Sequence, residues 1–212
     1  MEQEFVAAAR FVKEYLEKTE RPEMGKRSTA GFRWRHMLRV LNNARIIGKA
    51  EGADMDVLEM AVLLHDVAKL DPRSETTHHA VLGSEVAERY LRQAGLPSDY
   101  SHKVVEAVRY HAYDTYKDDL SLETLVLKDS DRLDEVGALG VIWVGIHAGR
   151  IGMDYRGCFG RAARDLHSLQ ELHLYTETGR EMFTKRLKIM NEFWLQVEEE
   201  LTGESLEPYS DF

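Results

Sequence analysis

The pair His65-Asp66 carries the clearest chemistry in this sequence. It follows the apolar run at 61–64, and Lys69 comes one helical turn later. Imidazole nitrogen and carboxylate oxygen both bind divalent transition metals. A metal held at the end of a buried helix can lower the pKa of a water molecule and make hydroxide available near neutral pH. His-Asp pairs are common, however, so this interpretation depends on further ligands elsewhere in the chain.

Four further histidine and aspartate residues lie on predicted helices or at their ends, where they could complete a metal site. They are His36 near the start of a predicted helix, His79 at the start of another, His111 at the end of a third, and Asp131 on a fourth. Helical bundles commonly build metal sites from side chains that project inward from facing helices. We therefore expect a metal centre in the middle of a bundle.

Apolar residues recur three and four positions apart along most of the chain, which predicts helices. No segment alternates convincingly between apolar and polar residues, and 140–146 does so only weakly, so the predicted class is all-α. Polar stretches at 20–31, 71–78 and 112–121 are expected to be loops, and 203–212 a frayed tail. The helices are expected at about 5–16, 32–50, 56–66, 79–94, 98–111, 122–135, 160–175 and 177–201, with another in the glycine-rich stretch that begins at 136.

Composition bounds the remaining possibilities. A chain of 212 residues is most simply one domain, and its formal net charge of -9 argues against general nucleic-acid binding. The single cysteine, Cys158, excludes an intrachain disulfide and fits a reducing compartment. The N-terminus lacks the features of a signal peptide, and no apolar run is long enough to span a membrane. We expect a cytoplasmic protein, with homo-oligomer formation left open.

Five short motifs occur in order along the chain. They are W-R-H-M-L-R-V at 34–40, A-V-L-L-H-D at 61–66, H-A-V-L-G at 79–83, A-V-R-Y-H at 107–111 and D-S-D-R-L-D at 129–134. Together they resemble the HD superfamily of metal-dependent phosphohydrolases, and most closely its small bacterial members related to nucleoside triphosphate pyrophosphohydrolases. The resemblance implies a single-domain helical bundle with a central metal site, spanning 1–212. Its HD core would cover about 30–145, and C-terminal helices at about 146–205 would pack on that core.

The same resemblance implies a ligand set. One divalent metal would be held by four side chains, namely His36, His65, Asp66 and Asp131. Asp129 and Asp134 compete with Asp131 for this role on residue type alone.

Two further histidines leave open whether the site holds one ion or two. His79 and His111 either bind a second metal, with Asp66 bridging, or contact the substrate. His79 is preferred over His78 because the H-x-x-x-G spacing begins there. Mixed nitrogen and oxygen ligation suits Mn, Fe, Co or Ni, and Mg is a further candidate.

The implied activity is hydrolysis of a phosphoester or phosphoanhydride in a small nucleotide by metal-activated water. Asp66 would hold the metal in the reaction, and Lys69 would contact phosphate or stabilise developing negative charge. A salt bridge at a helix C-terminus is an equally simple interpretation of Lys69. Two alternatives to the hydrolase remain: an HD-type di-iron oxygenase, and a non-catalytic nucleotide-binding module that its metal stabilises.

Overall fold

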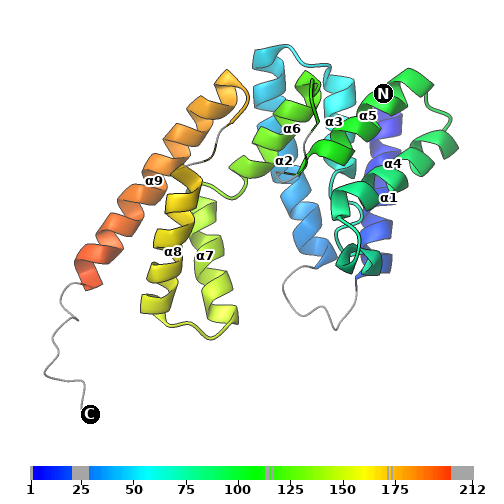
Figure 1. Ribbon diagram of the computed structural model, residues 1–212. Helices are drawn as coiled ribbons and strands as arrows, with labels where there is room; N and C mark the ends of the chain where they lie inside the picture. The colour runs from blue at the N-terminus through cyan, green and yellow to red at the C-terminus, as the bar shows by residue number, and fades with distance from the viewer. Residues whose placement is uncertain are drawn as a thin grey trace, which may run out of the picture. The chain divides into compact units, whose positions relative to one another are not determined.

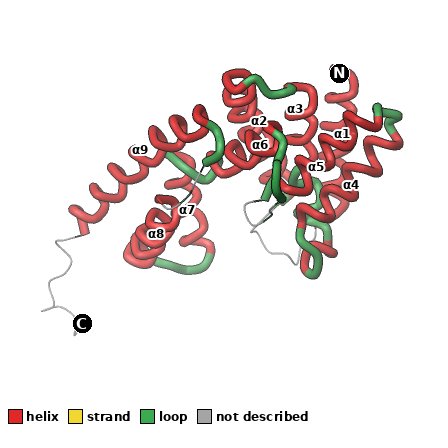
Figure 2. The backbone as a smooth tube through the Cα atoms, turned by 45° about the horizontal axis from the view of Figure 1, so that its top comes forward, coloured by secondary structure: helices red, strands yellow, loops and turns green. Residues whose placement is uncertain are grey.

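The computed structural model describes residues 2–20, 29–112, 115, 117–170, 172 and 174–201, without the side chains at 163–165, 167, 168 and 170. Within this part of the chain the regular secondary structure is entirely helical (Figure 2). The predicted all-α class is therefore confirmed. The elements are α1 (Glu2–Thr19), α2 (Ala30–Glu51), α3 (Met55–Leu64), the 3-10 helix η2 (Pro72–Glu75), α4 (His79–Gln93), α5 (Ser98–Tyr110), α6 (Leu122–Leu133), α7 (Ala138–Arg150), α8 (Tyr155–Gln170) and α9 (Glu177–Leu201).

The chain divides into two compact units. Unit 1 comprises 1–132 together with 175–179, and unit 2 comprises 133–174 together with 180–212. The predicted packing of the C-terminal helices on an HD core at about 30–145 stays a prediction. The expected tail at 203–212 lies outside the described residues, as does most of the loop expected at 20–31.

Helix α3 forms the centre of unit 1 and contacts α1, α2, α4 and α5 (Figure 1). Its ten residues are almost all apolar, and seven of them are buried. Exposing apolar side chains to water costs free energy. A helix with apolar residues around most of its circumference is therefore enclosed by other helices. The polar residues that follow α3 are consequently delivered into the interior of unit 1.

The ends of α3 are set by two local features. Asp54 caps its N-terminus, and the Asp54 side chain accepts a hydrogen bond from the Val57 backbone N–H. The helix therefore begins at Met55, one residue ahead of the expected start at about 56. The helix ends at Leu64, and His65 is its C-cap, so the His65-Asp66 pair lies at the end of a buried helix as predicted.

Unit 2 confirms one expectation from the sequence and corrects another. The helix expected in the glycine-rich stretch that begins at 136 is α7, which includes the weakly alternating segment 140–146 and packs against α8. Helix α8 begins at Tyr155, ahead of the expected 160, because the Asp154 side chain accepts a hydrogen bond from the Gly157 backbone N–H at 2.8 Å. That cap offsets the poor helix propensity of the glycine-rich segment.

None of the helices in the described ranges combines the length and the apolar character needed to cross a membrane.

Candidate metal centre

His65 and His111 lie at the ends of two neighbouring helices, α3 and α5, and each ring is fixed by the same kind of hydrogen bond to its own helix. The Nδ1–H of His65 donates to the Val62 carbonyl at 2.7 Å, and that of His111 donates to the Val108 carbonyl at 2.6 Å. Each histidine thus bonds the carbonyl three residues earlier, where the helix leaves carbonyl groups without an intrahelical partner. Both rings are buried, and the bond at Nδ1 leaves Nε2 as the nitrogen with a lone pair.

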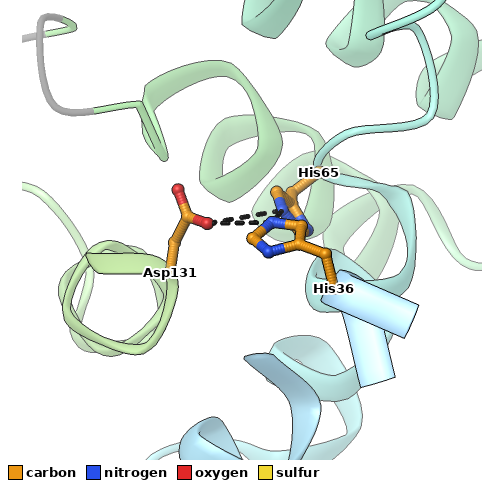
Figure 3. A group of neighbouring side chains, drawn as sticks. All are labelled: His36, His65 and Asp131. Atoms are coloured by element: carbon orange, nitrogen blue, oxygen red, sulfur yellow. Dashed lines mark hydrogen bonds and ion pairs between the residues drawn. The ribbon is translucent and has the colours of Figure 1, made fainter. Parts of the chain in front are cut away.

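His36 and Asp131 complete a first group with His65 (Figure 3). Asp131 comes from α6 and points at both rings, with its Oδ1 3.1 Å from His36 Nε2 and 3.8 Å from His65 Nε2. The two Nε2 atoms lie 3.4 Å apart. One ligand atom from each of the three residues falls within 4.8 Å of the others. Two imidazoles and a carboxylate from three helical elements therefore converge on one point.

The Asp66 carboxylate faces both halves of the site. Its Oδ2 lies 3.8 Å from His36 Nε2 and 4.0 Å from His65 Nε2. Its Oδ1 lies 3.6 Å from His79 Nε2 and 3.9 Å from His111 Nε2. Asp66 thus stands between a half-site around His36 and His65 and a second half-site around His79 and His111.

The protonation states suit metal ligation. Burial lowers the pKa of His79 to about 3 and that of His111 to about 4, and it also lowers the pKa of His65. These rings are therefore neutral at neutral pH and have a lone pair to offer. Divalent metals take neutral imidazole and ionised carboxylate as ligands.

Both carboxylates stay ionised despite their surroundings. Burial on its own raises the pKa of Asp66, but the neighbouring histidines in the protonated form that they take at low pH, together with Arg33 and Lys69, outweigh it and hold that pKa well below its usual range. Burial also raises the pKa of Asp131, and the hydrogen bond from His36 more than offsets this effect. The donor set, two ionised carboxylates among neutral imidazoles, fits a divalent metal with mixed nitrogen and oxygen ligation.

The structure separates Asp131 from its two competitors. Asp129 accepts hydrogen bonds from the Tyr175 and Thr176 backbone N–H groups and from the Thr176 hydroxyl, so its carboxylate stabilises the chain before α9. Among the described residues, Asp134 belongs to neither group of side chains that could hold a metal. Asp131 is the aspartate of this segment that meets His36 and His65.

The remaining predicted residues also gather here. Lys69 Nζ lies 3.0 Å from His79 Nε2 and 3.9 Å from Asp66 Oδ1. His78 turns its Nδ1 to the Ala80 backbone N–H and caps α4, which leaves His79 as the histidine of this pair at the site. All six predicted ligands and Lys69 therefore lie in one cluster, and their roles stay predictions.

One residue of the cluster was not predicted. Arg33 Nη1 donates to Asp66 Oδ2 at 2.9 Å. The sequence did indicate that Arg33 could lie near the site, because it precedes His36 by three residues and side chains at that spacing share a helix face. Arginines are common on helix surfaces, so the spacing did not single it out.

The sequence of this chain is similar to a known domain family and to a bacterial protein. The HD domain family matches residues 33–135. The uncharacterised protein YpgQ of Bacillus subtilis is 30% identical over 182 residues, which cover 82% of this chain and 87% of YpgQ.

Solved structures share the fold over nearly the full length. A predicted HD superfamily hydrolase from an uncultured Thermotogales bacterium is 25% identical, with a TM-score of 0.64 and coverage of 92% of this chain and 91% of that one. An HD-superfamily hydrolase from Bacillus thuringiensis is 23% identical, with a TM-score of 0.74 and coverage of 95% and 98%. YpgQ in complex with ADP is 23% identical, with a TM-score of 0.67 and coverage of 92% and 96%.

Proposed function

This chain belongs to the HD domain family, and from that premise we propose that it is a metal-dependent phosphohydrolase acting on a small nucleotide. The observation that carries the proposal is the convergence of His36, His65 and Asp131 on one point, with Asp66 beside them. HD superfamily hydrolases among the solved structures support hydrolysis as the reaction class.

The proposed roles follow from position. His36, His65, Asp66 and Asp131 would hold a divalent metal, which when bound supplies Lewis acidity toward phosphate oxygens and an activated water. His65 keeps its Nε2 in place through the Nδ1–H bond to Val62. The remaining two histidines, His79 and His111, either hold a second ion or contact the substrate.

The proposed role of Lys69 is to stabilise negative charge that develops on the substrate at the second half-site. Its ammonium lies beside His79 and Asp66 Oδ1, at the edge of the ligand set. When the ester or anhydride bond breaks, its electron pair leaves with the bridging oxygen, and a fixed cation nearby would stabilise the negative charge that develops there in the transition state.

A nucleotide is the proposed substrate class because YpgQ has been crystallised with ADP. The formal net charge of -9 repels such a substrate at long range, so the local cations of the site must provide the attraction. We propose manganese as the metal to supply first, since mixed imidazole and carboxylate ligation suits it.

The test is a hydrolysis panel with added Mn²⁺, run on wild type, Asp66→Ala and Asp99→Ala. The panel covers nucleoside mono-, di- and triphosphates, dinucleoside polyphosphates and a generic phosphoester, with phosphate and pyrophosphate scored separately. Asp99 is an exposed carboxylate in the first turn of α5 and serves as the matched control. We expect turnover by wild type and by Asp99→Ala, and loss of both turnover and bound metal in Asp66→Ala.

The outcomes separate the alternatives. Full activity in Asp66→Ala would overturn the proposal. Silence of wild type across the panel, with two irons per chain and oxygen-dependent turnover after anaerobic purification, would favour the di-iron oxygenase. Tight nucleotide binding without turnover would favour a binding module.

A further inference from the structure

The cluster has a closed floor and an open rim. His65, Asp66 and His111 form the floor, and their side chains are at most 4% exposed. Arg33, Lys69 and Asp131 form the rim, with 19%, 31% and 31% of their side chains exposed. A ligand that arrives from solvent therefore meets the rim first.

Two of the three rim residues are cations, and they approach opposite oxygens of the same carboxylate. Arg33 Nη1 lies 2.9 Å from Asp66 Oδ2, and Lys69 Nζ lies 3.9 Å from Asp66 Oδ1. Each half-site thus has a cation of its own. Lys69 already has a place in the proposed reaction, whereas Arg33 has none.

Helix α2 fixes where Arg33 can act. Thr29 caps this helix through a hydrogen bond from the Phe32 backbone N–H, so its first turn is well defined. Arg33 lies one turn before His36, and its guanidinium also lies over the Phe32 ring, 5.5 Å from the ring centroid. The guanidinium is therefore held at the mouth of the half-site by a ring contact and an ion pair.

We propose that Arg33 is a substrate-binding residue whose guanidinium donates to a phosphate oxygen of the bound nucleotide. A guanidinium is permanently charged and presents a planar fork of N–H donors that matches phosphate geometry. A metal held by Asp66 would compete with Arg33 for this carboxylate, and an incoming phosphate would then offer the guanidinium another anionic partner at the same place. This inference rests on the proposed function and adds a specific phosphate contact to it.

The test compares Arg33→Gln and Arg33→Lys with Arg35→Gln. Arg35 is exposed on the same helix, so its variant removes the same charge from the surface. Three quantities are measured for each protein: the Mn²⁺ Kd without nucleotide, the ADP Kd by calorimetry at saturating Mn²⁺, and kcat and KM on the best substrate of the panel. Retained helical circular dichroism and an unchanged melting profile establish that a variant is folded.

We expect Arg33→Gln to weaken ADP binding and raise KM by about 10- to 100-fold, the size of one or two charge-assisted hydrogen bonds, without weakening Mn²⁺ binding. Arg33→Lys should recover part of the loss, because lysine keeps the charge but not the fork. It also replaces Arg33→Gln in the test if the glutamine variant fails to fold. Arg35→Gln should match wild type in all three quantities.

The measurements distinguish failure of the role of Arg33 from failure of the proposed function. Unchanged ADP affinity and KM in Arg33→Gln, with turnover intact in wild type, would overturn the role of Arg33 and leave the proposed function standing. Weakened Mn²⁺ binding with unchanged ADP affinity would show that Arg33 only positions Asp66, and would also overturn the inference. Wild type that takes up Mn²⁺ yet neither binds ADP nor hydrolyses the panel would overturn the inference together with the proposed function.

Discussion

Asp131 supplies the carboxylate oxygen nearest to His36 and His65, so the choice between it and its neighbours is testable at the level of one residue. Asp131→Asn removes the charge at nearly constant shape, and we expect the Mn²⁺ Kd to rise by at least about 100-fold, because even residues that only support metal ligands are worth 10- to 100-fold. Asp134→Asn, three residues later, is the matched control and should bind Mn²⁺ as wild type does. Equal losses in both variants would contradict the assignment.

Substitution of Lys69 distinguishes a catalytic role for this residue from a purely structural one. If it stabilises negative charge in the transition state, Lys69→Met should lower kcat by about 10- to 100-fold while Mn²⁺ content and the melting temperature stay near wild type. Lys49→Met, which removes an exposed lysine from α2, controls for the lost charge. An unchanged kcat with lower thermal stability would instead support the simple salt-bridge interpretation.

Asp71 makes the stability of the loop after the site depend on pH. Its carboxylate accepts hydrogen bonds from the Arg73 side chain at 2.7 Å and from the Tyr15 hydroxyl at 2.8 Å. The Arg73 hydrogen bonds contribute most to holding the pKa of Asp71 below its usual range, and they prevail over the opposing effect of burial. A carboxyl group with a lowered pKa stabilises the folded state above its unfolded pKa of about 4, and this stabilisation is lost as pH falls below that value.

Asp71→Asn should therefore cost about 1–3 kcal/mol in the free energy of unfolding at pH 7, the range for lost charge-assisted hydrogen bonds. The difference from wild type should shrink steadily below about pH 4, because the carboxyl becomes protonated in the unfolded state while the native state still holds it ionised. Urea unfolding at several pH values measures it. A difference that stays constant from pH 7 to pH 3 would show that the ionised carboxylate is not the source of the stability.

At the scale of elements, a buried lysine fastens α6 to the end of α5. Lys128 Nζ donates to the carbonyls of Tyr110, Ala112 and Thr115 at 2.8, 2.6 and 3.0 Å. Tyr110 is the last residue of α5, and its neighbour His111 belongs to the cluster. One ammonium group thus satisfies carbonyls at a helix end and links the segment of His111 to the helix that carries Asp131.

Lys128→Met keeps the length of the side chain and removes the donor. Each buried carbonyl left without a hydrogen bond costs about 1–3 kcal/mol, so we expect a clear loss in the free energy of unfolding. Lys103→Met, at an exposed position of α5, should have little effect in the same chemical denaturation experiment. Equal stability of the two variants would show that water replaces the ammonium at no cost.

These elements also show what sequence patterns can and cannot reveal. The spacing of apolar residues predicted the helices, because that signal is local. The candidate ligands, which span 36–131, were implied by a family resemblance and not by any local pattern. Lys128 and Arg33 were not predicted, since a charged residue on a helix is normally exposed and only the tertiary structure brings its partner near. The ends of α3 were expected at about 56 and 66 and lie at Met55 and Leu64, because helix ends shift by one or two residues with small changes in backbone angles.

At the scale of the whole molecule, the cluster lies within one of the two compact units. The six proposed ligands fall between His36 and Asp131, and all of them belong to unit 1. They come from α2, the end of α3, the start of α4, the end of α5, and α6. A metal bound there would link elements that are far apart in the sequence, so its binding free energy would add to the folding stability of unit 1.

Metal removal should therefore change the stability of unit 1 selectively. At a Mn²⁺ concentration 100 times its Kd, binding adds about 2.7 kcal/mol to the native state, which corresponds to about 5–10 °C in melting temperature for a domain of this size. In hydrogen exchange, amides of α3 and α5 should slow by up to about 100-fold on addition of Mn²⁺, whereas amides of α7 and α8 should not change. Asp66→Ala should abolish the difference between metal-free and metal-loaded protein in both measurements. Equal slowing throughout α7 and α8 would contradict the prediction, because it would require the two units to unfold together.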